Sequence, residues 1–117
     1  MKHNLPFLRH ILEEADFLID NTKGLAFEDY LKDEVLKRAT ARSIEIIGEA
    51  SKNLAADFKR NHPDVEWKDI AGMRDKIIHF YFGIKWSVVW AVVANEIPGL
   101  KLNIEAIIKE IGEYKSE

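Results

Sequence analysis

Four side chains suited to acid–base or phosphate chemistry lie within eight residues of this sequence: Arg74, Asp75, His79 and Tyr81. An arginine presents a permanently charged, planar group that can donate two hydrogen bonds to a phosphate. A histidine can accept or donate a proton near neutral pH, and a nearby carboxylate favours its charged form. These groups suffice for phosphodiester cleavage without a metal ion. In RNA, the substrate's own 2′-hydroxyl would serve as the nucleophile.

We expect the four residues to lie on one helix that spans residues 67–82. At about 100° per residue, its core-facing sector is apolar. That sector contains Ile70, Met73, Ile77, Phe80 and Ile84. Asp75 and His79 fall outside it and, four residues apart, can contact each other. Arg74 and Tyr81 share another flank, because seven residues return to nearly the same angle.

Arg74 and His79 are five residues apart, or about 140° on a helix, so their side chains diverge on a single ideal helix. A reaching arginine, a distorted helix end near Gly83 or a second copy of the helix would bring them together. A two-fold dimer would place both flanks in one cleft. The residues can also be interpreted as an ordinary polar surface of an amphipathic helix with no catalytic role.

Composition limits the class of protein. The 117 residues fit one domain, residues 1–117, and include no cysteine, which excludes a disulfide framework, a thiolate zinc site and a cysteine nucleophile. The sequence also has no HExxH, P-loop or GxGxxG pattern, so we expect neither a metal nor another cofactor. No apolar run approaches the roughly 18–20 residues that cross a bilayer, and the first residues do not resemble a signal peptide. A cytoplasmic protein without membrane association is expected.

The apolar spacing predicts an all-α, antiparallel bundle of about four to six helices. Asn4 and Asp33 are candidate N-caps, and Pro98 suits the first turn of a last helix. Gly48 lies at an inward position of a long helix, where it would permit another helix to approach closely. Gly83 is expected to end the helix that carries the polar cluster.

The formal net charge is −3, so a general attraction to nucleic acid is not expected. Arg38 and Arg42 are four residues apart on the long helix and could guide RNA, but exposed salt bridges are the favoured interpretation. The three tryptophans could stack on bases. Their helical spacing favours core packing instead.

The sequence resembles the HepT-like toxins of the HEPN superfamily. Arg74, His79 and Tyr81 reproduce the R-x4-H-x-Y pattern of that family. Three further stretches resemble it: IEIIGEASKNL at residues 44–54, HPDVEWKDIAGMRD at residues 62–75 and VVWAVVANEIPGL at residues 88–100. The similarity covers residues 5–111, which is nearly the whole chain.

The resemblance implies a homodimer with a composite cleft, in which Arg74 and His79 are the catalytic residues of a metal-independent endoribonuclease. Asp75 stands where the family commonly has a polar residue, often asparagine, and would support the site. The resemblance also implies a partner, a minimal nucleotidyltransferase that acts as antitoxin and transfers AMP to Tyr81.

Two functions therefore remain open. The first is a ribonuclease toxin that is silenced by its transferase, and intact Arg74 and His79 favour it. The second is a non-catalytic module of the same fold that binds a nucleotide or protein surface. Asp75 and the acidic net charge favour this alternative, because a carboxylate in the cleft would repel phosphate.

Overall fold

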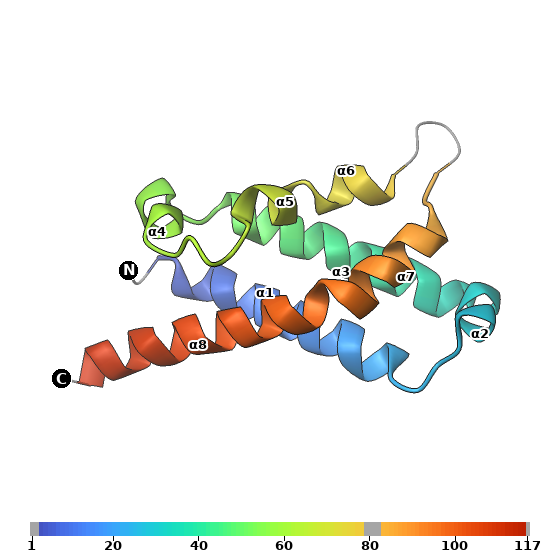
Figure 1. Ribbon diagram of the computed structural model, residues 1–117, viewed down its shortest axis with the longest axis horizontal. Coiled ribbons are helices and arrows are strands. Elements are labelled where there is room, and N and C mark those ends of the chain that lie inside the picture. The colour runs from blue at the N-terminus through green and yellow to red at the C-terminus, as the bar shows by residue number, and fades with distance from the viewer. Residues whose placement is uncertain (1–2, 79–82, 117) are drawn as a thin grey trace.

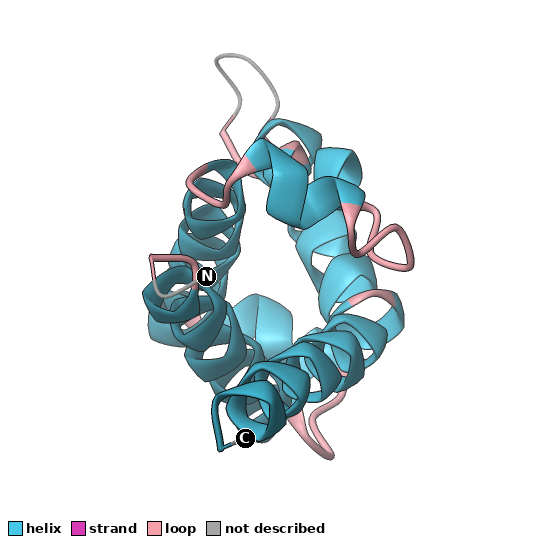
Figure 2. Ribbon diagram, turned by 90° about the vertical axis from the view of Figure 1, so that its left-hand side faces the viewer, coloured by secondary structure: helices cyan, strands magenta, loops and turns pink. Residues whose placement is uncertain are grey.

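The computed structural model describes the backbone of residues 3–78 and 83–116, with side chains up to Gly112. Helices run up and down along a body of about 50 × 30 × 20 Å (Figure 1). Seen from one end, they surround a shared interior (Figure 2). The expected all-α antiparallel bundle is confirmed.

Eight helices occur in the described part of the chain, four of them with ten or more residues. The long helices are α1 (Leu5–Thr22), α3 (Glu34–Lys52), α7 (Trp86–Asn95) and α8 (Ile97–Ser116). The short helices have five or six residues and are α2 (Phe27–Lys32), α4 (Ala56–Arg60), α5 (Trp67–Ala71) and α6 (Met73–Ile77). Within residues 3–78 and 83–116, no helix is long and apolar enough to span a membrane.

A hydrophobic core runs through the centre of the bundle, where α1 packs mainly against α3 and α8. Its largest fully buried side chains come from six helices: Leu8, Ile11, Leu18, Tyr30, Ile44, Ile47, Met73, Ile77, Val89, Val92, Ile97 and Ile104. Each buried aliphatic or aromatic side chain of this kind contributes about 1.5–3 kcal/mol through the apolar area removed from water.

One of the two expected N-caps is confirmed. The side chain of Asp33 accepts a hydrogen bond from Leu36 N at 2.9 Å and caps α3. Asn4 occupies the N-cap position of α1, as expected, but its side chain makes no capping hydrogen bond. Asn4 has helical backbone angles, and its Oδ1 accepts from Ala55 N at 3.0 Å instead of capping α1. Pro98 occupies the first turn of α8, as expected.

Gly48 allows α3 and α5 to touch. A Cβ atom at this position would lie 3.4 Å from the carbonyl oxygens of both Ile70 and Ala71. The backbone of α5 therefore rests against the glycine itself, which confirms the predicted close approach. This contact fixes the distance of α5, and of α6 directly after it, from the long helix.

The predicted single helix over residues 67–82 was wrong. The helix is interrupted at Gly72, which ends α5 and precedes α6. Helix α6 then ends at Ile77, because Ile78 takes an extended conformation with φ −90° and ψ 136°. The apolar sector persists across the interruption, since Ile70, Met73 and Ile77 are all buried. The apolar spacing is continuous across both short helices, so it wrongly predicted a single helix.

Candidate functional site

Arg74 lies in the first turn of α6, on the side that faces α3. Its Nε donates a hydrogen bond to Oε2 of Glu45, an α3 residue, at 3.1 Å. About half of the Arg74 side chain is exposed (48%), whereas Glu45 is more covered (30%). The contact through Nε leaves the outer edge of the guanidinium, with both terminal nitrogens, directed away from that bond. The two terminal nitrogens of that edge can donate parallel hydrogen bonds to a phosphate.

Asp75 is more exposed than Arg74, with 87% of its side chain accessible. Its Oδ1 lies 3.9 Å from Nη1 of Arg74, at the outer limit of an ion pair. Such a contact between exposed groups contributes at most about 1 kcal/mol. Asp75 is therefore close enough to influence the charge around Arg74, but it does not fix the arginine in place.

The motif residues after Asp75 belong to a chain segment whose two flanking stretches, residues 77–78 and 84–85, are hydrogen-bonded to each other. Lys85 N donates to the carbonyl oxygen of Ile77 at 2.8 Å, and Ile78 forms an antiparallel bridge with Ile84. Gly83 has φ +79°, a conformation that side-chain-bearing residues rarely adopt. The two ends of this segment are thus joined directly after α6, one turn beyond Arg74.

His79 and Tyr81 lie outside the described residues, so the predicted catalytic pair and modification site stay predictions. The wheel that placed Asp75 beside His79, and Arg74 beside Tyr81, required a helix that continues past Ile77. Since α6 ends there, helical spacing no longer relates these pairs.

A buried lysine anchors the start of α7. The Lys37 side chain is only 10% exposed, and its amine lies 2.8 Å from Glu34 and 5.1 Å from the centre of the Trp86 ring. The cation–π contact and the ion pair compensate for removing the charge from water. The hydrogen bond from Lys37 also lowers the pKa of Glu34. Trp86 is thereby held against α3, close to where the segment after α6 rejoins the bundle.

Acidic residues flank the other side of α6. Lys76 Nζ lies 2.8 Å from Glu96 Oε2, which ties α6 to the end of α7. A hollow of about 230 Å³ next to this pair is lined by Glu66, Asp69 and Glu96 among others. A shared hydrogen bond and repulsion from Asp69 raise the pKa of Glu66. This side of α6 would repel a phosphate, so an anionic substrate would approach Arg74 from the α3 side.

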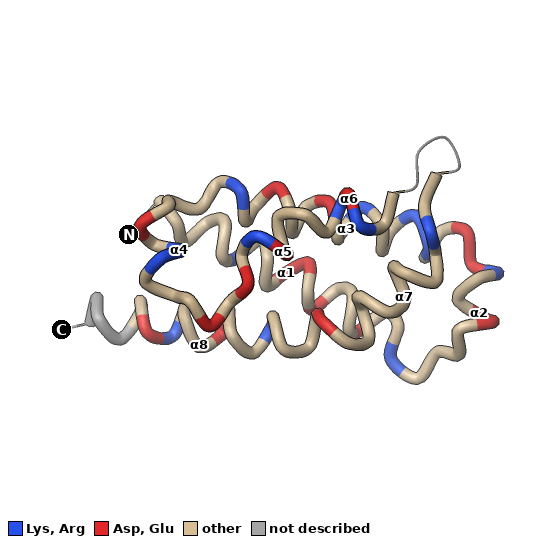
Figure 3. The backbone as a smooth tube through the Cα atoms, turned by 45° about the horizontal axis from the view of Figure 1, so that its top comes forward, with Lys and Arg blue, Asp and Glu red and all other residues tan. Residues whose placement is uncertain are grey.

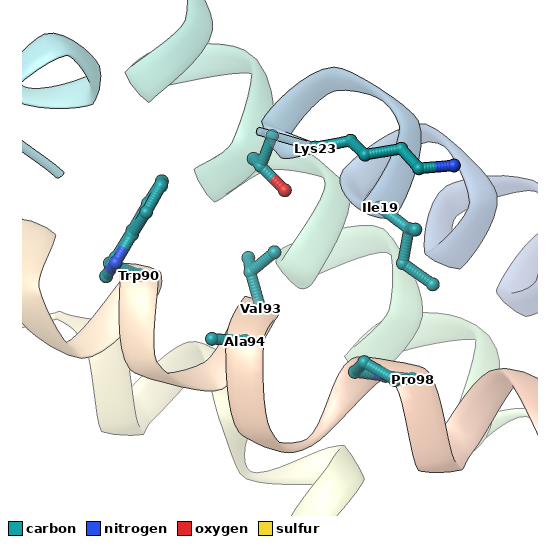
Figure 4. A pocket seen from close by; sticks show the side chains of 7 residues that line it. Ile19, Lys23, Trp90, Val93, Ala94 and Pro98 are labelled. Carbon is teal, nitrogen blue, oxygen red and sulfur yellow. The ribbon is translucent and has the colours of Figure 1, made fainter. Parts of the chain in front are cut away.

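A second hollow, of about 240 Å³, lies between α1, α7 and α8 (Figure 4). Trp90, Val93 and Pro98 form most of its apolar wall, with Lys23 at its edge. Trp90 also packs against Tyr30 in a tilted arrangement, with 4.9 Å between the ring centres and 40° between the ring planes. Its role is therefore mainly packing, in agreement with the interpretation of the tryptophans as core residues. Arg74 takes no part in this hollow.

Sequence reasoning missed Glu45 as a partner of Arg74. The two residues are 29 positions apart, and no spacing rule connects them. The only local indication was that α3 carries Gly48, one turn away, at the point where α5 touches it.

Comparison with known proteins gives a consistent result. A family model described as "Ribonuclease HepT-like" matches residues 11–107, which include the whole motif region. A protein named "Putative RNase" from Caldanaerobacter subterraneus subsp. tengcongensis is 51% identical over 94% of this chain and 98% of its own length.

Two archaeal proteins are also similar. A "Putative RNase" from Methanocaldococcus jannaschii is 47% identical over 90% of this chain and 87% of its own length. A "Probable ribonuclease HepT" from Thermococcus cleftensis is 45% identical over 88% of this chain and 94% of its own length. No solved structure matches the chain. These matches confirm the resemblance noted from the sequence.

Proposed function

This chain belongs to the ribonuclease HepT-like family, and we propose that it is a metal-independent endoribonuclease that uses Arg74 and His79. The observation that carries the proposal is the state of Arg74. Its guanidinium is half exposed and is oriented by Glu45 through Nε, so that the terminal nitrogens remain available to a phosphate. The single folded unit would be residues 1–117.

In the proposed reaction, the 2′-hydroxyl of a ribose attacks the adjacent phosphorus and the bond to the 5′-oxygen breaks. His79 accepts the proton of the attacking 2′-hydroxyl and donates it to the leaving 5′-oxygen. Arg74 stabilises the extra negative charge that the phosphate acquires in the transition state. The products are a 2′,3′-cyclic phosphate and a 5′-hydroxyl, so atoms and charges balance without a metal ion.

We also propose that the active form is a homodimer. A second copy placed about a two-fold axis next to α6 would add its own Arg74 and His79 to one cleft. This removes the need for both groups of one chain to converge. The exposed outer face of α6, which carries Asp75, leaves room for such a partner.

The proposed biological role is that of a cytoplasmic toxin, silenced by a minimal nucleotidyltransferase that acts as antitoxin. AMP transferred to the Tyr81 hydroxyl would place a phosphate charge two residues from His79 in the sequence. Such a group would compete with RNA for Arg74 and would also obstruct the cleft.

The alternative is a non-catalytic module that binds a nucleotide or a protein. The exposed carboxylate of Asp75 near Arg74 favours it, because that carboxylate opposes phosphate binding. Cleavage of RNA by the purified protein would decide between the two functions.

The experiment compares the wild type with Arg74→Ala and His79→Ala on a single-stranded RNA, with excess EDTA throughout. Loss of cleavage in both variants, with unchanged helical circular dichroism, supports the proposal. We expect Arg74→Ala to alter the free energy of unfolding by about 1 kcal/mol or less, because the Arg74 side chain is half exposed. Full activity of either variant, or loss of wild-type activity in EDTA, would contradict it.

A further inference from the structure

Two arginines on the outer face of α3 have like charges within contact distance. Arg38 and Arg42 are four residues apart, so about one turn of helix, or ~6 Å, separates them. Both side chains are exposed. Like charges at this spacing repel each other and destabilise the helix slightly.

Only two acidic residues stand at a spacing that would neutralise this pair within the helix. Glu34 precedes Arg38 by four residues, and Glu45 follows Arg42 by three. Both carboxylates bind other cations. Glu34 pairs with Lys37 at 2.8 Å, and Glu45 accepts the hydrogen bond from Arg74 at 3.1 Å.

Across residues 3–78 and 83–112, no carboxylate lies within ion-pair distance of Arg38 or Arg42. The interpretation of these arginines as members of exposed salt bridges was therefore wrong. Within the described residues neither arginine is held in an ion pair, although Lys37 and, to a smaller extent, the charge of Arg38 lower the pKa of Glu34. Both arginines are exposed on a chain whose net charge is −3. The positive potential is local to this part of α3.

The arginines also lie next to the candidate site. On a helical wheel, Arg38, Arg42 and Glu45 fall within a sector of about 60°. Glu45 is level with Arg74 along α3, and Lys37 is level with Trp86. Arg42 and Arg38 therefore occupy the stretch of α3 between α6 and the start of α7. Figure 3 shows basic positions of α3 and α6 along this edge of the molecule.

We propose that Arg38 and Arg42 bind the backbone phosphates of single-stranded RNA next to the phosphate that Arg74 contacts. This inference rests on the proposed function. Guanidinium groups are well suited to the task, because they bind phosphate bidentately and need no particular base. Arg38 and Arg42 on α3, together with Arg74 on α6, would guide the strand past the site. The acidic side of α6, around Glu96, would exclude the strand from the opposite side.

The test measures binding of a fluorescent 2′-O-methyl RNA oligonucleotide, which has no free 2′-hydroxyl and so is not cleaved. Its affinity for wild type and for Arg38→Gln/Arg42→Gln is measured at several salt concentrations. The matched control is Arg9→Gln/Arg60→Gln, which removes the same charge from exposed positions on α1 and α4. Glutamine preserves helix propensity, so circular dichroism should be unchanged in both.

Each phosphate contact adds about 0.7 to the slope of log affinity against log salt for a single strand. We expect the slope of Arg38→Gln/Arg42→Gln to fall by about 1.4, whereas the control keeps the wild-type slope. Equal slopes in the two double variants would overturn the inference.

A parallel assay with ordinary RNA separates this inference from the proposed function. Wild-type protein that binds with the expected slope difference but does not cleave would refute the ribonuclease and leave the phosphate track standing. Wild-type protein that cleaves, while both double variants bind alike, would refute only the track. In that assay we expect Arg38→Gln/Arg42→Gln to raise KM and to leave kcat nearly unchanged, since neither residue touches the reacting atoms.

Discussion

Arg74 and Glu45 join α6 to α3 through one hydrogen bond of 3.1 Å across 29 residues of sequence. The bond engages Nε, so it orients the guanidinium without occupying its outer edge. Glu45 is thereby a positioning residue for the group that would contact the phosphate.

We expect Glu45→Gln to reduce kcat for RNA cleavage on the order of tenfold and to change KM little. A small misplacement of a group that acts in the transition state is enough for a loss of this size. The free energy of unfolding should change by about 1 kcal/mol or less, because the pair is only partly buried.

The matched control is Glu96→Gln, which disrupts the Lys76 ion pair on the same short helix. It should leave kcat within about twofold of wild type. Such a change is clearly smaller than the roughly tenfold loss expected for Glu45→Gln, which corresponds to about 1.4 kcal/mol in the activation free energy. If both variants lose activity equally, Glu45 acts only by holding α6, and its orienting role is refuted.

A homodimer is the second prediction. Sedimentation at micromolar concentration should give a species of about twice the 13.5 kDa chain mass. The reason is the proposed composite cleft, to which each copy contributes its own Arg74 and His79. A 13.5 kDa species alone, at the concentration where RNA is cleaved, would contradict it.

The third prediction concerns Tyr81. After co-expression with the transferase, the wild type should gain mass in whole AMP units and lose cleavage activity. Tyr81→Phe should keep most of its activity, because the hydroxyl has no proton-transfer role in the proposed reaction, and it should escape silencing. AMP-sized additions that persist on Tyr81→Phe would move the modification to another residue.

The contact at Gly48 gives a fourth prediction. Gly48→Ala should be tolerated, because a Cβ atom 3.4 Å from two α5 carbonyl oxygens is at van der Waals distance and alanine favours the helix. Gly48→Leu should destabilise the fold by about 1–3 kcal/mol through overpacking. It should also lower cleavage, since α5 and α6 must move outward and stretch the Arg74 bond. Urea denaturation and a cleavage assay measure the two effects. Equal stability of the two variants would refute the close contact.

Glu66 and Asp69 give a pH-dependent prediction. Their shared hydrogen bond and mutual repulsion raise the pKa of Glu66 above its ordinary 4.5. The folded state therefore holds the proton more tightly than the unfolded state. This pair stabilises the fold at low pH and loses that contribution as the pH rises through the raised pKa. Asp69→Asn should remove the dependence and raise the urea midpoint at pH 7. A midpoint that does not respond would show that the pair is not coupled.

Local rules predicted the parts of the fold that local chemistry determines. Asp33 caps α3 because its carboxylate reaches an amide three residues on, and Pro98 begins α8 because proline suits a first turn. The close helix contact at Gly48 was also predictable, since a glycine at an inward helical position implies close packing.

The interruption at Gly72 and the helix end at Ile77 could not be predicted from the sequence. The buried spacing of Ile70, Met73 and Ile77 continues through both short helices, so the apolar pattern gives no indication of the interruption. The end of α6 depends on the pairing of Ile78 with Ile84 and on the bond from Lys85 to Ile77. Such tertiary contacts override helix propensity. The Arg74–Glu45 pair was hidden for the same reason.

The bond from Ala55 to Asn4 links residues 51 positions apart at the start of α4. Helix α4 has only five residues, and a helix that short does not persist unaided in water. Asn4, near the beginning of the chain, therefore satisfies a backbone amide at the start of α4. Part of the stability of α4 therefore depends on this contact with the residue that precedes α1. The rate of hydrogen exchange at the Ala55 amide would report how often this contact opens. One backbone amide thus monitors the packing of the start of the chain against α4.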